Sequence, residues 1–207
     1  MLIIFDCDGV LRSASLEAMY TAYLAIAKYL EKDPADFWQD LDEFKKWHNN
    51  DWHYNLQRMG VPLGSNYLPF NKIFHDIYDP CIVRFPWVEE VLEHLSQNHT
   101  LTVLSGAKYS SVFETLKSTA NYFVTIKGSD HVRKIKPDPE GIHLIMDEIG
   151  FDANDTVMIG DSEADILAGK RAGVMTVGVT WGMTDRKEMQ ELAPDHIFHD
   201  PMQLKSF

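Results

Sequence analysis

Two aspartates stand one residue apart at the end of the first apolar run of the chain. Residues 2–5 read Leu-Ile-Ile-Phe, and Asp6 and Asp8 follow them before Gly9. A strand buried on both faces reads as a continuous apolar run, and ligands of open α/β sheets bind just beyond the carboxyl ends of such strands. The two carboxylates therefore stand where chemistry is usually performed, and the alternative is a plain acidic turn closed by Gly9.

Two further segments carry groups that suit an anionic ligand. The strand predicted at 101–104 ends in Ser105 and Gly106, which offer a hydroxyl and an unhindered backbone N–H, both donors for a phosphoryl oxygen. Lys136 is held by two prolines just before a helix predicted to begin at Pro139. Taken alone, the Ser-Gly pair is an ordinary loop and the lysine is a surface charge.

A second pair of acids follows the strand predicted at 156–159. Asp161 comes directly after Gly160, and an acid at the end of a buried strand must be solvated, paired or metal-bound. Asp165 has the spacing of a capping box with Ser162, so its role is either in the site or only in starting the next helix.

The elements that must position these groups alternate along most of the chain. Short apolar strands and amphipathic helices alternate after Pro86, as expected for a doubly wound parallel α/β sheet. The predicted strands are 2–5, 101–104, 122–126, 156–159 and 175–179, and the predicted helices are 87–97, one from 109, 142–149 and 164–172.

An all-helical block interrupts this pattern after the first strand. Apolar residues recur at helical spacing over 16–30, with Ser13 or Ser15 as N-cap, and a second helix is predicted from Asp33 to His48. Weaker helical patterns end at Gly60 and before Pro80. We therefore expect a catalytic core made of residues 1–12 and 86–207, and an inserted helical cap domain of residues 13–85.

The composition and net charge of the chain limit the kinds of binding partner that we expect. The chain has 207 residues, of which 45% are hydrophobic, and a formal net charge of -12, so a nucleic acid or an anionic membrane is not expected as a partner. Two cysteines and the lack of a charged-then-apolar leader lead us to expect a cytoplasmic protein.

Taken in order, the motifs resemble those of the haloacid dehalogenase superfamily, and within it the phosphoglycolate phosphatase-like members that carry a helical cap. The matching segments are Phe-Asp-Cys-Asp-Gly at 5–9, Lys-Pro-Asp-Pro at 136–139 and Gly-Asp-Ser-Glu-Ala-Asp at 160–165. The resemblance covers nearly the whole chain, although the cap matches in position and helical character only.

The resemblance implies a magnesium-dependent phosphatase acting on a small phosphorylated metabolite. Asp6 would be the nucleophile that forms an aspartyl-phosphate, and Asp8 would protonate the leaving alkoxide and then activate water. Mg²⁺ would be held by the carboxylates of Asp6 and Asp161 and by the backbone carbonyl of Asp8, with Asp165 as a supplementary ligand. The phosphoryl oxygens would be held by Ser105, Gly106 and Lys136.

The second aspartate separates this chain from some relatives. Carbon–halogen and phosphonate-cleaving members lack the acid that stands at Asp8, so these reactions are disfavoured. Two alternatives stay open: a phosphosugar mutase, which keeps all the core motifs, and a non-catalytic protein that senses phosphate or binds a partner.

Several residues stand outside the matched motifs. Arg12 follows the nucleophile turn, and we favour a solvated hinge charge over a contact with a second anionic group of the substrate. Trp52 is expected in the core of the cap. Polar residues of the same stretch are candidates for substrate contacts, namely His48, Asn49, Asn50 and His53.

Overall fold

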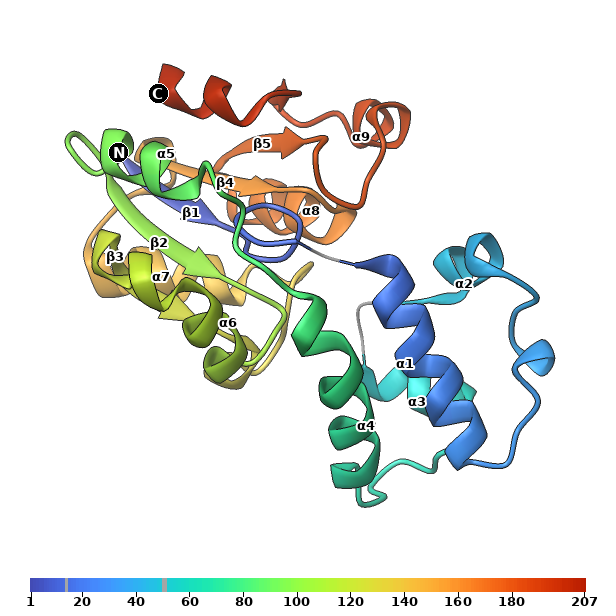
Figure 1. Cartoon of the computed structure of the whole chain (residues 1–207). Coiled ribbons are helices and arrows are strands. Elements are labelled where there is room, and N and C mark those ends of the chain that lie inside the picture. The colour runs from blue at the N-terminus through green and yellow to red at the C-terminus, as the bar shows by residue number, and fades with distance from the viewer. Residues whose placement is uncertain (14, 50–51) are drawn as a thin grey trace. The chain divides into compact units, whose positions relative to one another are not determined.

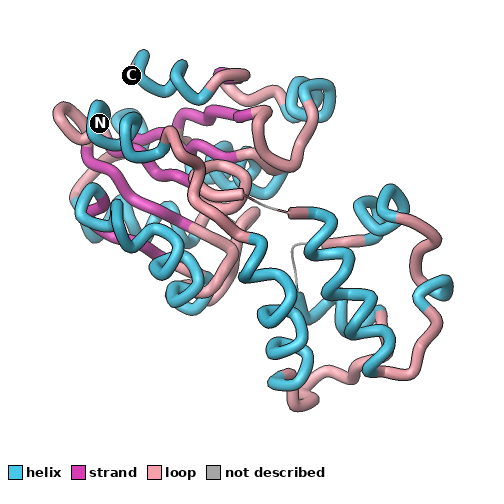
Figure 2. Tube along the Cα trace, viewed as in Figure 1, coloured by secondary structure: helices cyan, strands magenta, loops and turns pink. Residues whose placement is uncertain are grey.

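The chain divides into two compact units. The computed structural model describes residues 1–13, 15–49 and 52–207. One unit comprises Met1–Ala14 and Val83–Phe207, and the other is Ser15–Ile82, so the second unit is inserted after the first strand of the first (Figure 2). No helix in the described ranges is long and apolar enough to cross a membrane.

The first unit is built on a six-stranded sheet in which every paired neighbour is parallel, in the order β3-β2-β1-β4-β5-β6 (Figure 1). This confirms the α/β fold class predicted from the sequence. The edge strand β6 was not predicted, because three partly exposed residues are too few to show a pattern. The strands are β1 (Leu2–Phe5), β2 (Thr100–Leu104), β3 (Phe123–Lys127), β4 (Thr156–Gly160), β5 (Met175–Val179) and β6 (His196–Phe198).

Helices cover both faces of the sheet. Ile3 and Phe5 belong to a buried cluster with apolar residues of α5 (Val88–Leu95) and α6 (Tyr109–Leu116). Leu2 and Ile4, which point to the opposite face, belong to a second cluster with α7 (Glu140–Ile149) and α8 (Glu163–Ala172). Because both faces are buried, the central strand reads as the continuous apolar run seen in the sequence. The last helix of this unit is α9 (Arg186–Leu192).

The position of β1 decides where the site forms. It pairs with β2 on one side and with β4 on the other, so Phe5 is in register with Val103 and with Ile159. Asp6, Ser105 and Asp161 therefore follow three neighbouring strands at the same carboxyl edge.

The inserted unit is helical and has its own aromatic core. Tyr23, Trp38, Phe44 and Trp47 are buried together, and their rings meet at centroid distances of 4.5–6.3 Å. The first helix is capped by Ser15, whose Oγ accepts from the N–H of Ala18 at 3.1 Å. The helices are α1 (Leu16–Tyr29), α2 (Leu41–Trp47), α3 (Trp52–Arg58) and α4 (Leu68–Tyr78).

The single helix predicted from Asp33 to His48 is wrong. Asp33 caps only the short 3-10 helix η1, by accepting from the N–H of Ala35 at 3.0 Å. A new helix begins after Asp40, whose carboxylate accepts from the N–H of Glu43 at 2.9 Å. In the segment between η1 and this helix, the side chain of Trp38 is buried in the core. The 3-10 helices are η1 (Pro34–Asp36), η2 (Asp79–Cys81), η3 (Lys117–Tyr122), η4 (Ser129–His131), η5 (Ala153–Asp155) and η6 (Pro201–Ser206).

Candidate active site

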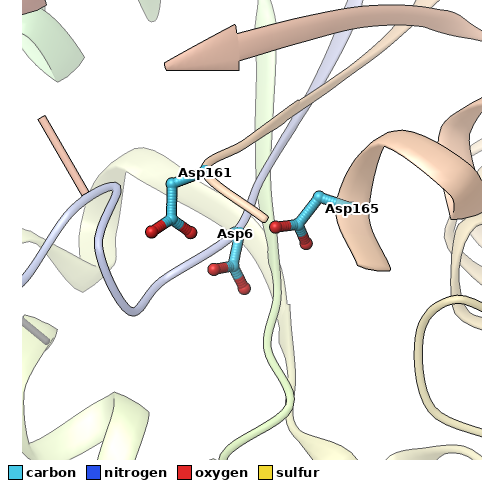
Figure 3. Close-up of side chains that lie close together, drawn as sticks. All are labelled: Asp6, Asp161 and Asp165. Carbon is cyan, nitrogen blue, oxygen red and sulfur yellow. The ribbon is translucent and has the colours of Figure 1, made fainter. Parts of the chain in front are cut away.

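Three aspartates from two loops and a helix converge at the carboxyl edge of the sheet. Asp6 follows β1, Asp161 follows β4, and Asp165 lies in the first turn of α8. Figure 3 shows the three side chains together, and one carboxylate oxygen of each lies within 4.8 Å of the others. All three residues are buried, with 6%, 3% and 1% of their surface exposed. The structure thus brings together three acids that the sequence places up to 159 positions apart.

Lys136 is the cation of this cluster. Its Nζ donates to Asp6 Oδ1 at 2.5 Å, to Asp165 Oδ1 at 2.6 Å and to the carbonyl oxygen of Leu104 at 2.8 Å. An ammonium has three hydrogens to donate, and all three are committed to protein oxygens here. A contact between Lys136 and a phosphoryl oxygen stays a prediction, and it would require the release of one of these bonds.

Burial and crowding shift the protonation of the cluster. Burial raises the pKa of Asp6 from 3.8 to about 7, against the nearby charge of Lys136, and the charges of Asp165 and Asp8 raise it further. The pKa of Asp161 is also raised well above its usual range, by burial and then by the charges of Asp6 and Asp165. Burial alone would lower the pKa of Lys136, but the two carboxylates that it contacts raise it above its usual range.

Two glycines make room for Asp161. A Cβ atom on Gly9 would lie 2.1 Å from Asp161 Oδ2, and one on Gly182 would lie 2.2 Å from the same oxygen. Gly9 also has a φ of +78°, which L side chains rarely adopt. The N–H of Met183 donates to Asp161 Oδ2 at 2.7 Å and fixes the carboxylate. No sequence signal pointed to the backbone of Met183.

Asp165 both caps α8 and lies in the carboxylate cluster, the two placements that its spacing left open. Its Oδ2 accepts from the N–H of Ser162 at 3.0 Å and from the Ser162 hydroxyl at 2.6 Å, so it helps to start α8. Its Oδ1 accepts from Lys136, as described above. A Cβ on Gly160 would lie 2.1 Å from the Cβ of Asp165, so the strand needs glycine there.

Ser105 and Gly106 lie at the carboxyl end of β2. Ser105 is buried, and its hydroxyl accepts from the N–H of Ala107 at 3.0 Å and donates to Asp8 Oδ2 at 3.4 Å. Gly106 is exposed, and a Cβ there would meet nothing within 4 Å. The backbone at Gly106 is thus open to a ligand.

Asp8 lies outside the set of three clustered carboxylates and is paired with Arg12 instead. Arg12 Nε donates to Asp8 Oδ1 at 2.9 Å, and Nη2 donates to Asp8 Oδ2 at 3.1 Å. Arg12 is only 1% exposed, so the interpretation of this residue as a solvated hinge charge is wrong. The spacing of Asp8 and Arg12, four residues apart across the glycine turn, was the signal in the sequence for this pair.

The cluster fits a divalent cation. Three buried carboxylates face one ammonium, and so many like charges do not stay ionised without a further positive charge. Mg²⁺ takes oxygen ligands and retains several waters, which suits the carboxylate oxygens of Asp6, Asp161 and Asp165. Participation of the Asp8 backbone carbonyl stays a prediction.

In the helical unit, the candidate residues differ in their surroundings. Burial lowers the pKa of His48 to about 4, and its ring packs against Tyr23 and Phe44 at 5.7 and 5.6 Å. His53 is exposed, with its ring 4.7 Å from that of Tyr67.

Asn49 and Trp52 belong to the same stretch of the helical unit. Asn49 is exposed, and its backbone N–H and carbonyl oxygen bond the side chain of Asn55. Trp52 packs against the aromatic core, as predicted. Asn50 lies outside the described residues.

Comparison with known proteins agrees with this geometry. Residues 3–179 match the family model of the haloacid dehalogenase-like hydrolases. The pyrophosphatase PpaX of Oceanobacillus iheyensis is 33% identical over 126 residues, 59% of each chain, and that of Bacillus velezensis is 31% identical over 136 residues, 64% of this chain and 62% of the relative. The chain thus spans about three fifths of the length of these curated relatives.

Solved structures show the same fold over nearly the whole chain. A haloacid dehalogenase-like family hydrolase from Streptococcus pneumoniae superimposes with a TM-score of 0.77 at 20% identity, covering 99% of this chain and 96% of that one. A predicted phosphoglycolate phosphatase from Haemophilus somnus gives 0.80 at 24% identity, with coverage of 99% and 96%. The parallel sheet and the buried aspartates at its carboxyl edge define an α/β protein with an acidic site. The chain belongs to the haloacid dehalogenase-like hydrolase family, as its motifs predicted.

Proposed function

We propose that this chain is a magnesium-dependent phosphatase that hydrolyses a small phosphate ester through an aspartyl-phosphate on Asp6. The observation that carries the proposal is the convergence of Asp6, Asp161 and Asp165 around Lys136 at the carboxyl edge of the sheet. A bound Mg²⁺ would supply positive charge to the carboxylates and to the transferring phosphoryl group. The family likeness supports this reaction class.

In the first step, Asp6 attacks phosphorus. Lys136 holds Asp6 Oδ1, and no hydrogen bond to Oδ2 is found within the described part of the chain, so we assign the attack on phosphorus to Oδ2. A bond forms between Oδ2 and phosphorus, and the bond between phosphorus and the ester oxygen breaks. The ester oxygen leaves with a proton from Asp8. The backbone N–H at Gly106 binds one phosphoryl oxygen, and the Ser105 hydroxyl binds another after releasing its bond to Asp8.

In the second step, water attacks the aspartyl-phosphate. Asp8, now ionised, takes a proton from the water as it attacks phosphorus, and the bond between phosphorus and Asp6 breaks. Inorganic phosphate leaves and the Asp6 carboxylate is restored.

The substrate class follows from the site and the relatives. The clustered carboxylates and a bound metal would contact only the phosphoryl group of the substrate. The rest of the substrate must therefore be recognised by other residues, and we assign this recognition to the helical cap, residues 13–85. Pyrophosphate belongs among the candidates because relatives at 31–33% identity are named pyrophosphatases. Phosphoglycolate belongs there because of the sequence resemblance. A small, cytoplasmic metabolite is the expected partner.

The test is phosphate release by the purified chain with and without magnesium. The panel is p-nitrophenyl phosphate, phosphoglycolate, pyrophosphate and hexose phosphates, and the variants are Asp6→Asn and Asp8→Asn. Asp195→Asn is the matched control, because Asp195 bonds Thr176 near the start of β5, far along the strand from its carboxyl end.

We expect magnesium-dependent release that Asp6→Asn abolishes and Asp195→Asn leaves intact. Release that survives in Asp6→Asn would contradict the mechanism. A folded wild type that binds magnesium but releases no phosphate from any ester would favour the mutase or the phosphate-sensing hypothesis instead.

A further inference from the structure

Arg12 is a buried arginine that no step above uses. It lies in the turn after the nucleophile, and a short backbone ladder holds this turn closed: Gly9 N–H donates to the Arg12 carbonyl at 2.8 Å, and Arg12 N–H donates to the Cys7 carbonyl at 3.0 Å. With 1% of its surface exposed, its guanidinium is out of reach of solvent. A buried charge requires a compensating partner, so what the guanidinium contacts shows what it does.

Two of its nitrogens form a fork on Asp8. Nε meets Oδ1 at 2.9 Å and Nη2 meets Oδ2 at 3.1 Å, which is the bidentate arrangement that planar guanidinium favours with a carboxylate. Such a fork fixes the plane of the carboxylate as well as its position. Asp8 needs this restraint, because its side chain is 26% exposed and has room for other orientations.

The third nitrogen anchors the fork to α6. Arg12 Nη1 donates to the carbonyl oxygen of Ser111 at 2.8 Å, to the Ser111 hydroxyl at 3.2 Å and to the Thr115 hydroxyl at 3.0 Å. Ser111 and Thr115 are four residues apart and so lie on one face of the helix. The guanidinium therefore bridges a rigid helix to Asp8.

Within residues 1–13, 15–49 and 52–207, the hydrogen bonds on Asp8 leave one lone-pair direction of its carboxylate open. A carboxylate offers about four lone-pair sites. Arg12 uses one on each oxygen, and the Ser105 hydroxyl approaches Oδ2 at 3.4 Å. The open lone pair on Oδ1 is thus held in a fixed direction, while the neighbouring serine is the residue assigned to the phosphoryl group.

We propose that Arg12 is a positioning residue that fixes the Asp8 carboxylate for proton transfer to the leaving oxygen, an inference that rests on the proposed phosphatase function. Its effect depends on the leaving group. An alkoxide requires a proton as it departs, whereas p-nitrophenolate is stable without one. Misplacing Asp8 therefore slows the release of an alcohol far more than the release of p-nitrophenol.

The experiment compares kcat/KM for glycerol phosphate and p-nitrophenyl phosphate, at saturating magnesium, because kcat/KM reports the step in which the leaving group departs. Arg12→Lys keeps the charge but replaces the fork by a single point of contact. The double variant Ser111→Ala and Thr115→Val removes the two hydroxyl contacts of the anchor, keeps the contact with the Ser111 carbonyl oxygen, and leaves Asp8 and Arg12 unchanged. Arg186→Lys, at an exposed position of α9, is the matched control.

We expect Arg12→Lys to lower kcat/KM for glycerol phosphate by roughly 10- to 100-fold and for p-nitrophenyl phosphate by less than about threefold. The double variant should show the same selectivity with a smaller loss, and it carries the test if Arg12→Lys does not fold.

An equal loss on both substrates, or no loss on either in the folded variants, would overturn the inference and leave Arg12 with a purely structural role. A wild type that is inactive on both esters is a different result, because it overturns the proposed function and this inference with it.

Discussion

Replacing Asp6 by asparagine should stabilise the metal-free protein at neutral and alkaline pH while abolishing turnover. Burial raises the pKa of Asp6 from 3.8 to about 7. Since each tenfold change in proton affinity corresponds to about 1.4 kcal/mol, ionising Asp6 in the folded, metal-free chain costs roughly 4 kcal/mol more than in the unfolded chain. The pKa of about 7 already includes the favourable charge and hydrogen bond of Lys136, so the loss of that bond in the variant is not subtracted again. The net gain expected at pH 8 is therefore roughly 4 kcal/mol.

The pH dependence follows from the same values. Between about pH 4 and pH 7 the unfolded chain has released the Asp6 proton and the folded chain still holds it, so the free energy of unfolding of the metal-free wild type falls as the pH rises. The raised pKa of Asp161 acts with the same sign. Asp6→Asn has no proton to lose at this position, and its stability should depend less on pH.

The assay is urea denaturation in the presence of a chelator at pH 5 and pH 8, repeated with magnesium. Asp195→Asn is the control, because hydrogen bonds from Thr176 lower the pKa of Asp195, so this carboxylate stabilises the fold above its unfolded pKa and its loss should destabilise the protein at pH 8. Magnesium should stabilise the wild type at pH 8 far more than Asp6→Asn. The reasoning is refuted if the metal-free wild type is equally stable at both pH values, or if Asp6→Asn is the less stable protein at pH 8.

Two further predictions concern a glycine and the helical unit. Gly182→Ala would place a Cβ 2.5 Å from the Cβ of Asp161, so we expect about a 100-fold loss of kcat/KM, a higher magnesium requirement and a lower melting temperature. Unchanged magnesium titration curves would count against this prediction. Trp38→Ala removes a side chain that is 2% exposed, so it should lower the free energy of unfolding, measured by urea denaturation, by roughly 3 to 5 kcal/mol. Tyr29→Ala, at a position 55% exposed, should lower it much less. Equal losses would contradict the assignment of Trp38 to the core.

The sheet could be predicted because burial on both faces leaves a direct trace in the sequence. Residues 2–5 and 157–159 are continuous apolar runs, and each is followed within two residues by the acid that the structure places at the carboxyl edge. The strand order could not be predicted from these runs, because it depends on how the helices cross over. The short edge strand β6 left no pattern at all.

Contacts that depend on tertiary packing could be predicted from the sequence less well than the strands. The helix expected from Asp33 to His48 breaks because Asp40 caps a new start and the core takes up Trp38, which no local pattern shows. Arg12 was expected in solvent because the local sequence does not show the helix that supplies its hydroxyl and carbonyl partners. Its partners Ser111 and Thr115 come from a helix about 100 positions away.

The measurement that tests the central claim most directly is the capture of the aspartyl-phosphate on Asp6. Asp8→Asn should still release p-nitrophenol, which needs no proton, but should hydrolyse the intermediate slowly because water activation requires Asp8. After mixing with magnesium and p-nitrophenyl phosphate, quenching in acid and reduction with borohydride, mass spectrometry should find Asp6 converted to homoserine. A burst of p-nitrophenol with Asp6 unmodified, or with the label on another residue, would contradict the account.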